Sequence, residues 1–432
     1  MQKSIKIYWI FVIEFDIITV LTDKRSIVMK YVIFLGDGMA DYPIETLGGK
    51  TPLGKANKPN MDALCASGET GLVKTVDDAL PPGSDVANLS VMGYDPTLYY
   101  TGRSPLEALS IGVSLKDSDV TFRANLVTLT DENVYENKTM ADYSSGEITT
   151  AEAHELIAYI KEHIKLPNIS FYGGTSYRHL MVWDGGSKNV TLTPPHDISD
   201  RKITDYLPKG DGAEAILDIM KQSYALLKDH PVNKNRIARG LNPANSLWIW
   251  GEGTKPRLSL FADKFGLSGT MISAVDLLKG IGTGAGMDVL EVQGATGTID
   301  TNFDGKAQAA INALKRGADF VYIHMEAPDE CGHHGDLEGK IKSIELIDEK
   351  VVGPVTDFLK STGEAFKILI TPDHPTPIRL KTHVHDAVPF VIYDSRTSHA
   401  GGSGLSYCEE NAEKTGLFIS PGHKLIERFL GE

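Results

Sequence analysis

Short, uninterrupted apolar runs that alternate with helical patterns most constrain the fold of this chain. The runs "YVIFL" from residue 31, "FVYIHM" from residue 320 and "FKILIT" from residue 366 have the length of buried strands. Between the second and third runs, residues 339–359 show apolar positions at helical spacing. Buried strands that alternate with helices indicate a parallel sheet. We therefore predict an α/β fold with helices on both faces of the sheet.

A different pattern occupies the middle of the sequence. Between about residues 110 and 257, shorter alternating stretches such as "VTFRANLVTL" are separated by loop clusters such as "TPPHDISD". A helical run covers residues 151–164. Alternation of apolar and polar residues indicates half-buried strands. We expect a smaller α+β domain, 111–257, inserted between two parts of the larger domain, 29–110 and 258–432.

The first 28 residues stand apart from both patterns. Lysines precede an apolar run at 8–13, as in a signal peptide, but Glu14 and Asp16 interrupt the apolar character and no small-residue cleavage site follows. A new start at Met29, directly before the first strand, suggests that residues 1–28 are an N-terminal extension. We assign no function to this extension.

Charge and cysteine content disfavour several classes of partner. The net charge is −14 without any run of Lys or Arg, which argues against nucleic acid and anionic membranes. No stretch has the apolar length of a membrane span. The three cysteines are too few and too scattered for a disulfide framework, so we expect a cytoplasmic location. The sequence does not indicate an oligomeric state.

Potential metal ligands follow the predicted strands, at the sheet edge where open parallel sheets bind ligands. Each of them alone would more simply be a capping Asp or a surface His. Their convergence on one edge predicts a site for divalent ions, and mixed carboxylate and imidazole ligands suit zinc or manganese better than calcium. The candidates are Asp37, Asp329, His333, Asp373, His374, His383 and His385.

A site for two metal ions implies displacement at phosphorus or hydrolysis, with water or a side chain as the nucleophile. In "PPGSDVANLSVMG", Ser84 lies where a loop is expected to become a helix. Its hydroxyl would lie at the positive end of the helix dipole, beside N–H groups that can hold a phosphoryl oxygen. The simpler alternative is that Ser84 only caps the helix.

The order of these motifs carries a resemblance to a known family. GDG, PPGSDV, D-x-x-x-H-x-G, DH and H-x-x-x-x-VP follow one another in the chain. This order resembles the archaeal-type cofactor-independent phosphoglycerate mutases of the alkaline phosphatase superfamily, over nearly the whole chain from about residue 30. The resemblance implies an alkaline-phosphatase-like sheet and a metal-bound serine that takes phosphate from one substrate hydroxyl and returns it to another. It also implies that the inserted domain closes over the substrate.

The resemblance implies roles for individual residues and two divalent ions, manganese, zinc or magnesium. It selects His383 over His385, because the family's ligand precedes "VPF" by the longer spacing. The implied ligands are Ser84, Asp37, Asp373 and His374 for one ion, and Asp329, His333 and His383 for the other. Ser84 would be the phosphorylated nucleophile and Lys264 a further catalytic residue. Arg103 and Asn125 are similar to substrate contacts.

Two positions depart from the family pattern. Where the family usually has arginine, in "AGRI" and "RGAG" segments, this chain has Glu147 in "SSGEI" and Trp250 in "PANSLWIWGEG". A glutamate can accept hydrogen bonds from an ammonium group, and a tryptophan face favours a cation. An amino alcohol such as homoserine is therefore an alternative substrate, as in a proposed homoserine kinase branch of the family. The simpler interpretation is that both positions lie outside the pocket, or that another arginine, such as Arg178, compensates.

A third hypothesis is a non-catalytic binding protein on the same fold. The complete set of six metal ligands argues against it, because a protein that had lost its activity would have no reason to keep these polar groups together. We therefore expect an enzyme that acts on a small phosphorylated metabolite or an amino alcohol.

Overall fold

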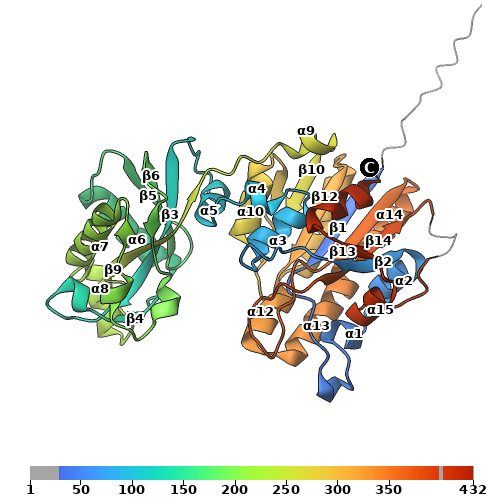
Figure 1. The fold of residues 1–432 in the computed structure, drawn as a ribbon, viewed down its shortest axis with the longest axis horizontal. Coiled ribbons are helices and arrows are strands. Elements are labelled where there is room, and N and C mark those ends of the chain that lie inside the picture. The colour runs from blue at the N-terminus through green and yellow to red at the C-terminus, as the bar shows by residue number, and fades with distance from the viewer. Residues whose placement is uncertain (1–28, 398–401, 432) are drawn as a thin grey trace, which may run out of the picture.

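The structure, a computed structural model, describes residues 29–397 and 402–431, so the predicted extension 1–28 lies outside the described residues. Figure 1 shows two lobes side by side, with α5 (Ser104–Ser110) at their junction. The larger lobe is built on an eight-stranded sheet and the smaller lobe on a five-stranded sheet. Within the described residues, no helix combines the length and hydropathy that crossing a membrane requires.

The three apolar runs of the sequence form adjacent central strands of the large sheet. These are β1 (Lys30–Gly36), β12 (Phe320–Met325) and β13 (Phe366–Thr371), with Val32 paired to Val321 on one side and to Ile368 on the other. All three pair in parallel, as predicted. The sheet order is β11-β10-β12-β1-β13-β14-β2-β15. Its remaining strands are β2 (Glu69–Val73), β10 (Gly269–Ile272), β11 (Asp288–Leu290), β14 (Val388–Asp394) and β15 (Phe418–Ile419).

The sheet is mixed rather than purely parallel. Strand β14 runs antiparallel to both β13 and β2. A parallel neighbour needs a long crossover, whereas the loop between β13 and β14 returns to the same edge of the sheet. That loop carries the Asp-His pair after β13 and both histidines before β14, so the reversal keeps them together at one edge.

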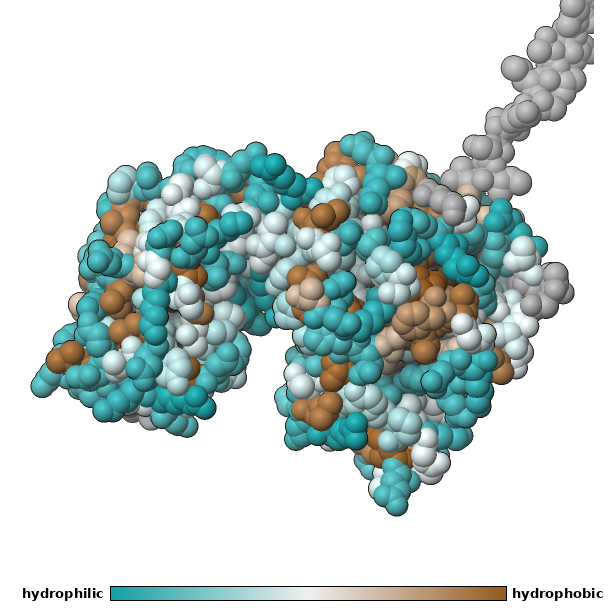
Figure 2. All heavy atoms as spheres, viewed as in Figure 1, coloured by the Kyte–Doolittle hydropathy of each residue, from teal (hydrophilic) through white to brown (hydrophobic). Residues whose placement is uncertain are grey.

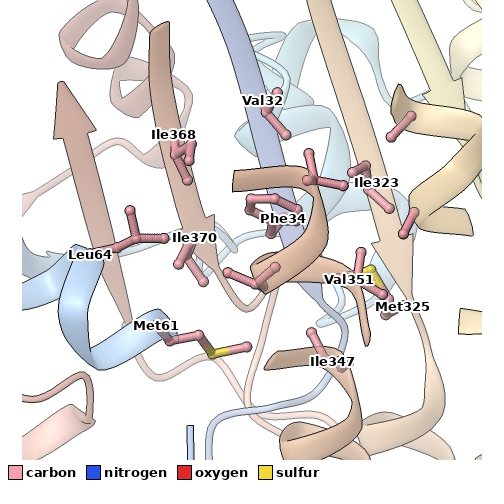
Figure 3. Close-up of a cluster of buried hydrophobic side chains, with 14 of the residues drawn as sticks. Val32, Phe34, Met61, Leu64, Ile323, Met325, Ile347, Val351, Ile368 and Ile370 are labelled. Atoms are coloured by element: carbon pink, nitrogen blue, oxygen red, sulfur yellow. The ribbon is translucent and has the colours of Figure 1, made fainter. Parts of the chain in front are cut away.

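Helices cover both faces of the large sheet, in agreement with the predicted fold class. Alternate strand residues point to opposite faces, so Val32 and Phe34 belong to one core and Ile33 and Leu35 to another. Figure 3 shows the first core, where Met61 and Ile347 pack against strand residues such as Phe34. Its helices are α2 (Pro59–Ser67), α11 (Phe303–Lys315), α13 (Leu337–Ile347), a π-helical turn (Asp348–Val352) and α14 (Gly353–Thr362).

The opposite face packs against a second group of helices. They are α3 (Ser84–Val91), α5, α9 (Phe261–Phe265), α10 (Asp276–Gly284) and α16 (Leu425–Leu430). The other helices of the larger lobe are α1 (Pro52–Lys55), α4 (Pro96–Tyr99), α12 (Ala327–His334) and α15 (Glu409–Lys414).

The smaller lobe comes from the segment for which an inserted α+β domain was predicted. Strand β3 (Asp119–Leu129) is central and pairs antiparallel with β4 (Met140–Asp142), β6 (Arg178–Asp184) and β9 (Ser246–Thr254), and β5 (Ile169–Tyr172) extends β6. One face of this sheet packs against α6 (Thr150–His163), α7 (Ala213–Leu227) and α8 (Pro231–Ala238). Strands β7 (Val190–Thr191) and β8 (Lys209–Gly210) form a separate pair. The limits 111 and 257 of the inserted domain stay a prediction.

Candidate active site

A buried group of polar side chains lies at the carboxyl ends of β1 and β13. Asp37 follows β1, and Asp373 and His374 follow β13. One ligand atom of each lies within 4.8 Å of the others. His374 Nε2 is 3.4 Å from Asp373 Oδ2 and 3.6 Å from Asp37 Oδ1. The adjacent parallel strands end at the same edge, which brings together residues more than 330 positions apart. We call these three residues the inner group.

A second group lies beside the inner group, on α12 and the loop before β14. Asp329 and His333 are one helical turn apart, with His333 Nε2 3.2 Å from Asp329 Oδ2. His383 Nε2 is 3.3 Å from Asp329 Oδ1 and 2.9 Å from His333 Nε2. The His383 ring stacks on His374 of the inner group at 3.9 Å between centroids. We call Asp329, His333 and His383 the outer group.

The chemistry of both groups fits a divalent metal ion. Asp37 Oδ1 is buried and has no hydrogen-bond partner among the described residues. Burial raises the pKa of Asp37 well above its usual value, and the carboxylates of Asp373 and Asp329 raise it further. In the outer group two imidazole nitrogens face each other at 2.9 Å. A cation in the inner group would supply the contact that Asp37 Oδ1 lacks, and the two facing imidazole nitrogens of the outer group are suitable ligands for a second cation.

Ser84 is the first residue of α3 and points to the inner group. Its Oγ lies 3.2 Å from His374 Nε2. Gly83 occupies the N-cap position, and no side-chain hydrogen bond caps the helix, so Ser84 does not act as the cap. Helices α3 and α12 both lie on the side of the larger lobe that faces the smaller lobe (Figure 1).

Several polar residues around the inner group escaped the sequence analysis. Asn88, four residues after Ser84 on the same face of α3, donates to Ser84 O at 2.8 Å and to Asp373 Oδ2 at 2.9 Å. Tyr322 and His324 of β12 contact Asn88 and Asp37. The sequence did contain a signal for His324. Burying a histidine inside the run "FVYIHM" costs free energy unless the ring has a hydrogen-bond partner, so a buried polar partner could have been expected.

A cavity of about 480 Å³ lies between the two lobes. Figure 2 shows the surface deeply hollowed there. Arg123 and Arg178 line the cavity from the smaller lobe, and Arg103 and Glu326 line it from the larger lobe. Burial raises the pKa of Glu326 to about 7, with Asp329 and Glu330 adding to the shift. The pKa of Arg103 is also raised, because Asp85 and Glu107 outweigh the opposing effect of its burial.

The predicted substrate residues divide into two sets. Arg103 and Arg178 line the cavity. Asn125 is buried in β3 and accepts a hydrogen bond from Trp250 Nε1 at 3.1 Å. The Arg123 guanidinium lies over the Trp250 ring, 4.7 Å from its centroid. A cation of the protein therefore occupies the ring face that an ammonium group of a ligand would use. Glu147 is exposed and is not among the residues that line the cavity.

Arg123 was missed by the sequence analysis. It is buried, and its Nε and Nη2 donate to the two carboxylate oxygens of Glu107 at 3.0 and 2.6 Å. This bidentate pair joins β3 of the smaller lobe to α5 at the junction. In the stretch "VTFRANLVTL" Arg123 alternates with the apolar residues that face the core, so the sequence contained no signal of its buried pair.

Lys264 lies away from both ligand groups, and the catalytic role expected for it stays a prediction. Lys264 lies on α9, where Phe261 packs on Phe320, the first residue of β12, at 4.6 Å between ring centroids. Both metal-ligand groups lie at the opposite, carboxyl edge of the sheet. The Lys264 side chain is exposed and its Nζ lies 5.3 Å from the ring centroid of Tyr94. A short motif match located the segment but could not determine which edge of the sheet it occupies.

Comparisons with known proteins agree with this architecture. The sequence model of the family described as 2,3-bisphosphoglycerate-independent phosphoglycerate mutase matches residues 65–233. A probable enzyme of that name from Geobacter sulfurreducens is 52% identical over 93% of this chain and 100% of its own length. One from Methanosarcina acetivorans is 50% identical over 90% of this chain and 96% of its length.

Solved structures give the same result. A Pyrococcus horikoshii protein superposes with a TM-score of 0.78 and 29% identity, covering 94% of this chain and 98% of the other. The cofactor-independent phosphoglycerate mutase from Thermoplasma acidophilum superposes with a TM-score of 0.64 and 25% identity, covering 93% and 99%. On the strength of the long, closely similar relatives and the shared fold, this chain belongs to the family of 2,3-bisphosphoglycerate-independent phosphoglycerate mutases.

Proposed function

We propose that this protein interconverts 2-phosphoglycerate and 3-phosphoglycerate by passing the phosphoryl group through Ser84. One observation carries the proposal: Ser84 Oγ lies at the start of α3, 3.2 Å from His374 of the inner group. Relatives about half identical over nearly the whole chain bear the name of this activity, which supports the choice of substrate.

We further propose one divalent ion in each group. Mixed carboxylate and imidazole donors favour manganese or zinc, and magnesium fits less well because it prefers oxygen ligands. Bound ions would lower the pKa of a coordinated hydroxyl and neutralise charge on the phosphoryl oxygens. The inner group would bind the ion that also contacts Ser84. The outer group would bind the ion that lies nearer the cavity.

The chain's own residues then account for the transfer. Ser84 Oγ forms a bond to phosphorus and loses its proton, while the bond from phosphorus to the substrate oxygen breaks and that oxygen gains a proton. In the return step the oxygen of the other substrate hydroxyl bonds to phosphorus and loses its proton, while the bond from Ser84 Oγ to phosphorus breaks and Oγ gains a proton. The N–H groups at the start of α3 can hold the oxygens of the phosphorylated serine. Asn88, bonded to both Ser84 O and Asp373, orients the nucleophile relative to the inner group.

The cavity suits an anionic substrate better than an amine. Arg103 and Arg178 reach it from different lobes, and a guanidinium binds carboxylate or phosphate in a bidentate manner. Trp250 and Glu147 were the two residues expected to bind an ammonium group. Arg123 covers the Trp250 ring, and Glu147 is not among the residues that line the cavity. Closure of the smaller lobe over the substrate would exclude water from the phosphorylated serine.

The test compares two activities on one purified sample: interconversion of the phosphoglycerates, and ATP-dependent phosphorylation of homoserine. We expect the first and not the second. Ser84→Ala should abolish interconversion, and mass spectrometry after substrate addition should find phosphate on the peptide containing Ser84. Ser90→Ala, a buried serine on the same helix, is the matched control and should retain activity. Transfer that survives Ser84→Ala would refute the phosphoserine route.

A further inference from the structure

His324 contacts the inner group from inside the sheet. It is the fifth residue of β12, its ring is fully buried, and its Nε2 lies 2.9 Å from Asp37 Oδ2. Its Nδ1 lies 3.2 Å from the Oγ of Ser273, which directly follows β10. The chain Ser273–His324–Asp37 therefore crosses three neighbouring strands, β10, β12 and β1.

The carboxylate of Asp37 determines which ring nitrogen of His324 carries the hydrogen, because a carboxylate ionised as a metal ligand accepts hydrogen bonds and does not donate them. Ser273 Oγ already accepts a hydrogen bond from Val275 N at 3.0 Å. Its hydroxyl hydrogen can donate to Nδ1 of His324, which matches a ring that carries its hydrogen on Nε2. With Nδ1 as acceptor, Nε2 carries the hydrogen and donates it to Asp37.

The two carboxylates of the inner group are held very differently. Asp373 receives three donors, Gly38 N at 3.1 Å and His374 N at 2.9 Å on Oδ1, and Asn88 Nδ2 at 2.9 Å on Oδ2. Asp37 has the His324 contact on Oδ2, while its Oδ1 has no hydrogen-bond partner within residues 29–397 and 402–431. The orientation of Asp37 therefore depends on one donor, whereas that of Asp373 depends on several.

We propose that His324 is a positioning residue for the metal site: its Nε2–H holds Oδ2 of Asp37 and leaves Oδ1 directed at the ion of the inner group. This inference rests on the metal role of the inner group in the proposed function. Partners that orient a ligand side chain commonly change metal affinity by about 10- to 100-fold when they are removed. Lys306, fully buried on α11, supports the arrangement by donating to His324 O at 3.0 Å, which fixes the end of β12.

The same strand supplies a matched control. Tyr322 lies two residues earlier on the same face of β12, is also fully buried, and donates to Asn88 Oδ1 at 2.5 Å. Its removal would disturb the core as the loss of His324 does. It acts only on Asn88, however, and Asp373 keeps its two backbone donors without it. Tyr322→Phe thus tests for a general effect on stability without releasing a metal ligand.

The experiment measures binding of Mn²⁺ alone, by electron paramagnetic resonance, in a His333→Ala background that disables the outer group. Four proteins are compared: this background, and the background with His324→Leu, His324→Gln or Tyr322→Phe. The melting temperature of each metal-free protein reports stability separately. We expect His324→Leu to weaken Mn²⁺ binding by about 10- to 100-fold. We expect His324→Gln, which retains an N–H donor at similar reach, to restore most of the affinity, and Tyr322→Phe to change it by less than about threefold.

Three outcomes would overturn the inference, and each can be told apart from the others. Wild-type Mn²⁺ affinity in His324→Leu, with a lowered melting temperature like that of Tyr322→Phe, would show that His324 only stabilises the core. Absence of Mn²⁺ binding in the background protein and in the unmodified protein would refute the metal role of the inner group itself, and with it this inference. If His324→Leu does not fold, Ser273→Ala, which removes the partner of His324 Nδ1, takes its place, and a Mn²⁺ affinity equal to that of the background would refute the inference.

Discussion

The guanidinium of Arg123 lies 4.7 Å from the centre of the Trp250 ring, so the aromatic face that suggested an amine-bearing substrate is occupied by a cation of the protein itself. Arg123 and Trp250 are directly opposite each other on the paired strands β3 and β9. Position 250, where the family usually has arginine, carries a tryptophan here. Its neighbour Arg123 lines the cavity and supplies the positive charge instead. This relationship removes the main argument for a kinase.

Replacing Arg178 should weaken substrate binding. Arg178 lines the cavity from β6, and its guanidinium lies 5.5 Å from the ring centroid of Tyr177. Loss of one charge-assisted contact typically costs about 1.5–3 kcal/mol, so Arg178→Met should lower kcat/KM for phosphoglycerate by about 10- to 100-fold. Arg257→Met is the control, because Arg257 is exposed and pairs with Asp117 at 3.8 Å. Equal kinetics in both variants would exclude Arg178 from the substrate site.

Lys264 should be dispensable for catalysis, contrary to the expectation from its motif. It lies on α9, at the edge of the sheet remote from both ligand groups, and its side chain is exposed. Lys264→Met should therefore keep kcat and KM within about threefold of the unmodified protein, as is usual for surface substitutions. A large loss of kcat with an unchanged melting temperature would show that Lys264 reaches the site in another conformation.

The sheet and the two clusters of candidate ligands were predictable because they depend on local pattern and one topological rule. Apolar runs such as "FKILIT" predict buried strands wherever they occur, and parallel strands end at a common edge, so Asp37 and Asp373 were expected at the same edge of the sheet. The contacts of His324 and Asn88 were not predictable, since they depend on which strands are neighbours and on side-chain reach. The Arg123 pair with Glu107 depends on how two lobes meet, which no periodicity records.

A buried ion pair beneath the site should be important for stability. Lys340 Nζ lies 2.8 Å from Asp41 Oδ2, with side chains 0% and 1% exposed, and also donates to the carbonyl oxygens of Ala40 and Thr376. Lys340→Met would leave the Asp41 carboxylate buried without its cation, which costs about 3–5 kcal/mol of unfolding free energy. Lys342→Met, which breaks an exposed pair with Glu345, should cost less than about 1 kcal/mol. Urea denaturation of the metal-free proteins measures both, and similar losses would contradict this account.

His179 should make stability depend on pH. Burial lowers its pKa to about 3, with a smaller contribution from His154, so the folded protein keeps this ring neutral below pH 6. The unfolded chain binds the proton near its ordinary pKa of about 6.5, and stability therefore falls as the pH drops below that value. Between pH 7 and pH 5 the contribution is about 1–2 kcal/mol. Urea denaturation at both pH values should show a smaller acid-induced loss in His179→Gln than in the unmodified protein; equal losses would contradict it.

Two histidines in one loop allow the outer group to be tested against a close control. His383 and His385 are half-buried, and each bonds the loop before Ser84, through His383 Nδ1 to Pro82 O at 3.1 Å and His385 Nε2 to Leu80 O at 2.8 Å. His383 alone of the two also belongs to the outer group, with Asp329 and His333.

We therefore expect His383→Ala to lose about one equivalent of bound Mn²⁺ and to lower kcat/KM by at least about 100-fold. His385→Ala should keep both within about threefold, because it loses only a loop contact. Metal content by atomic absorption and kinetics with phosphoglycerate measure the difference. If both variants lost activity while keeping their metal, anchoring of the loop that carries Ser84 would explain the role of these histidines, and His383 would not be a ligand.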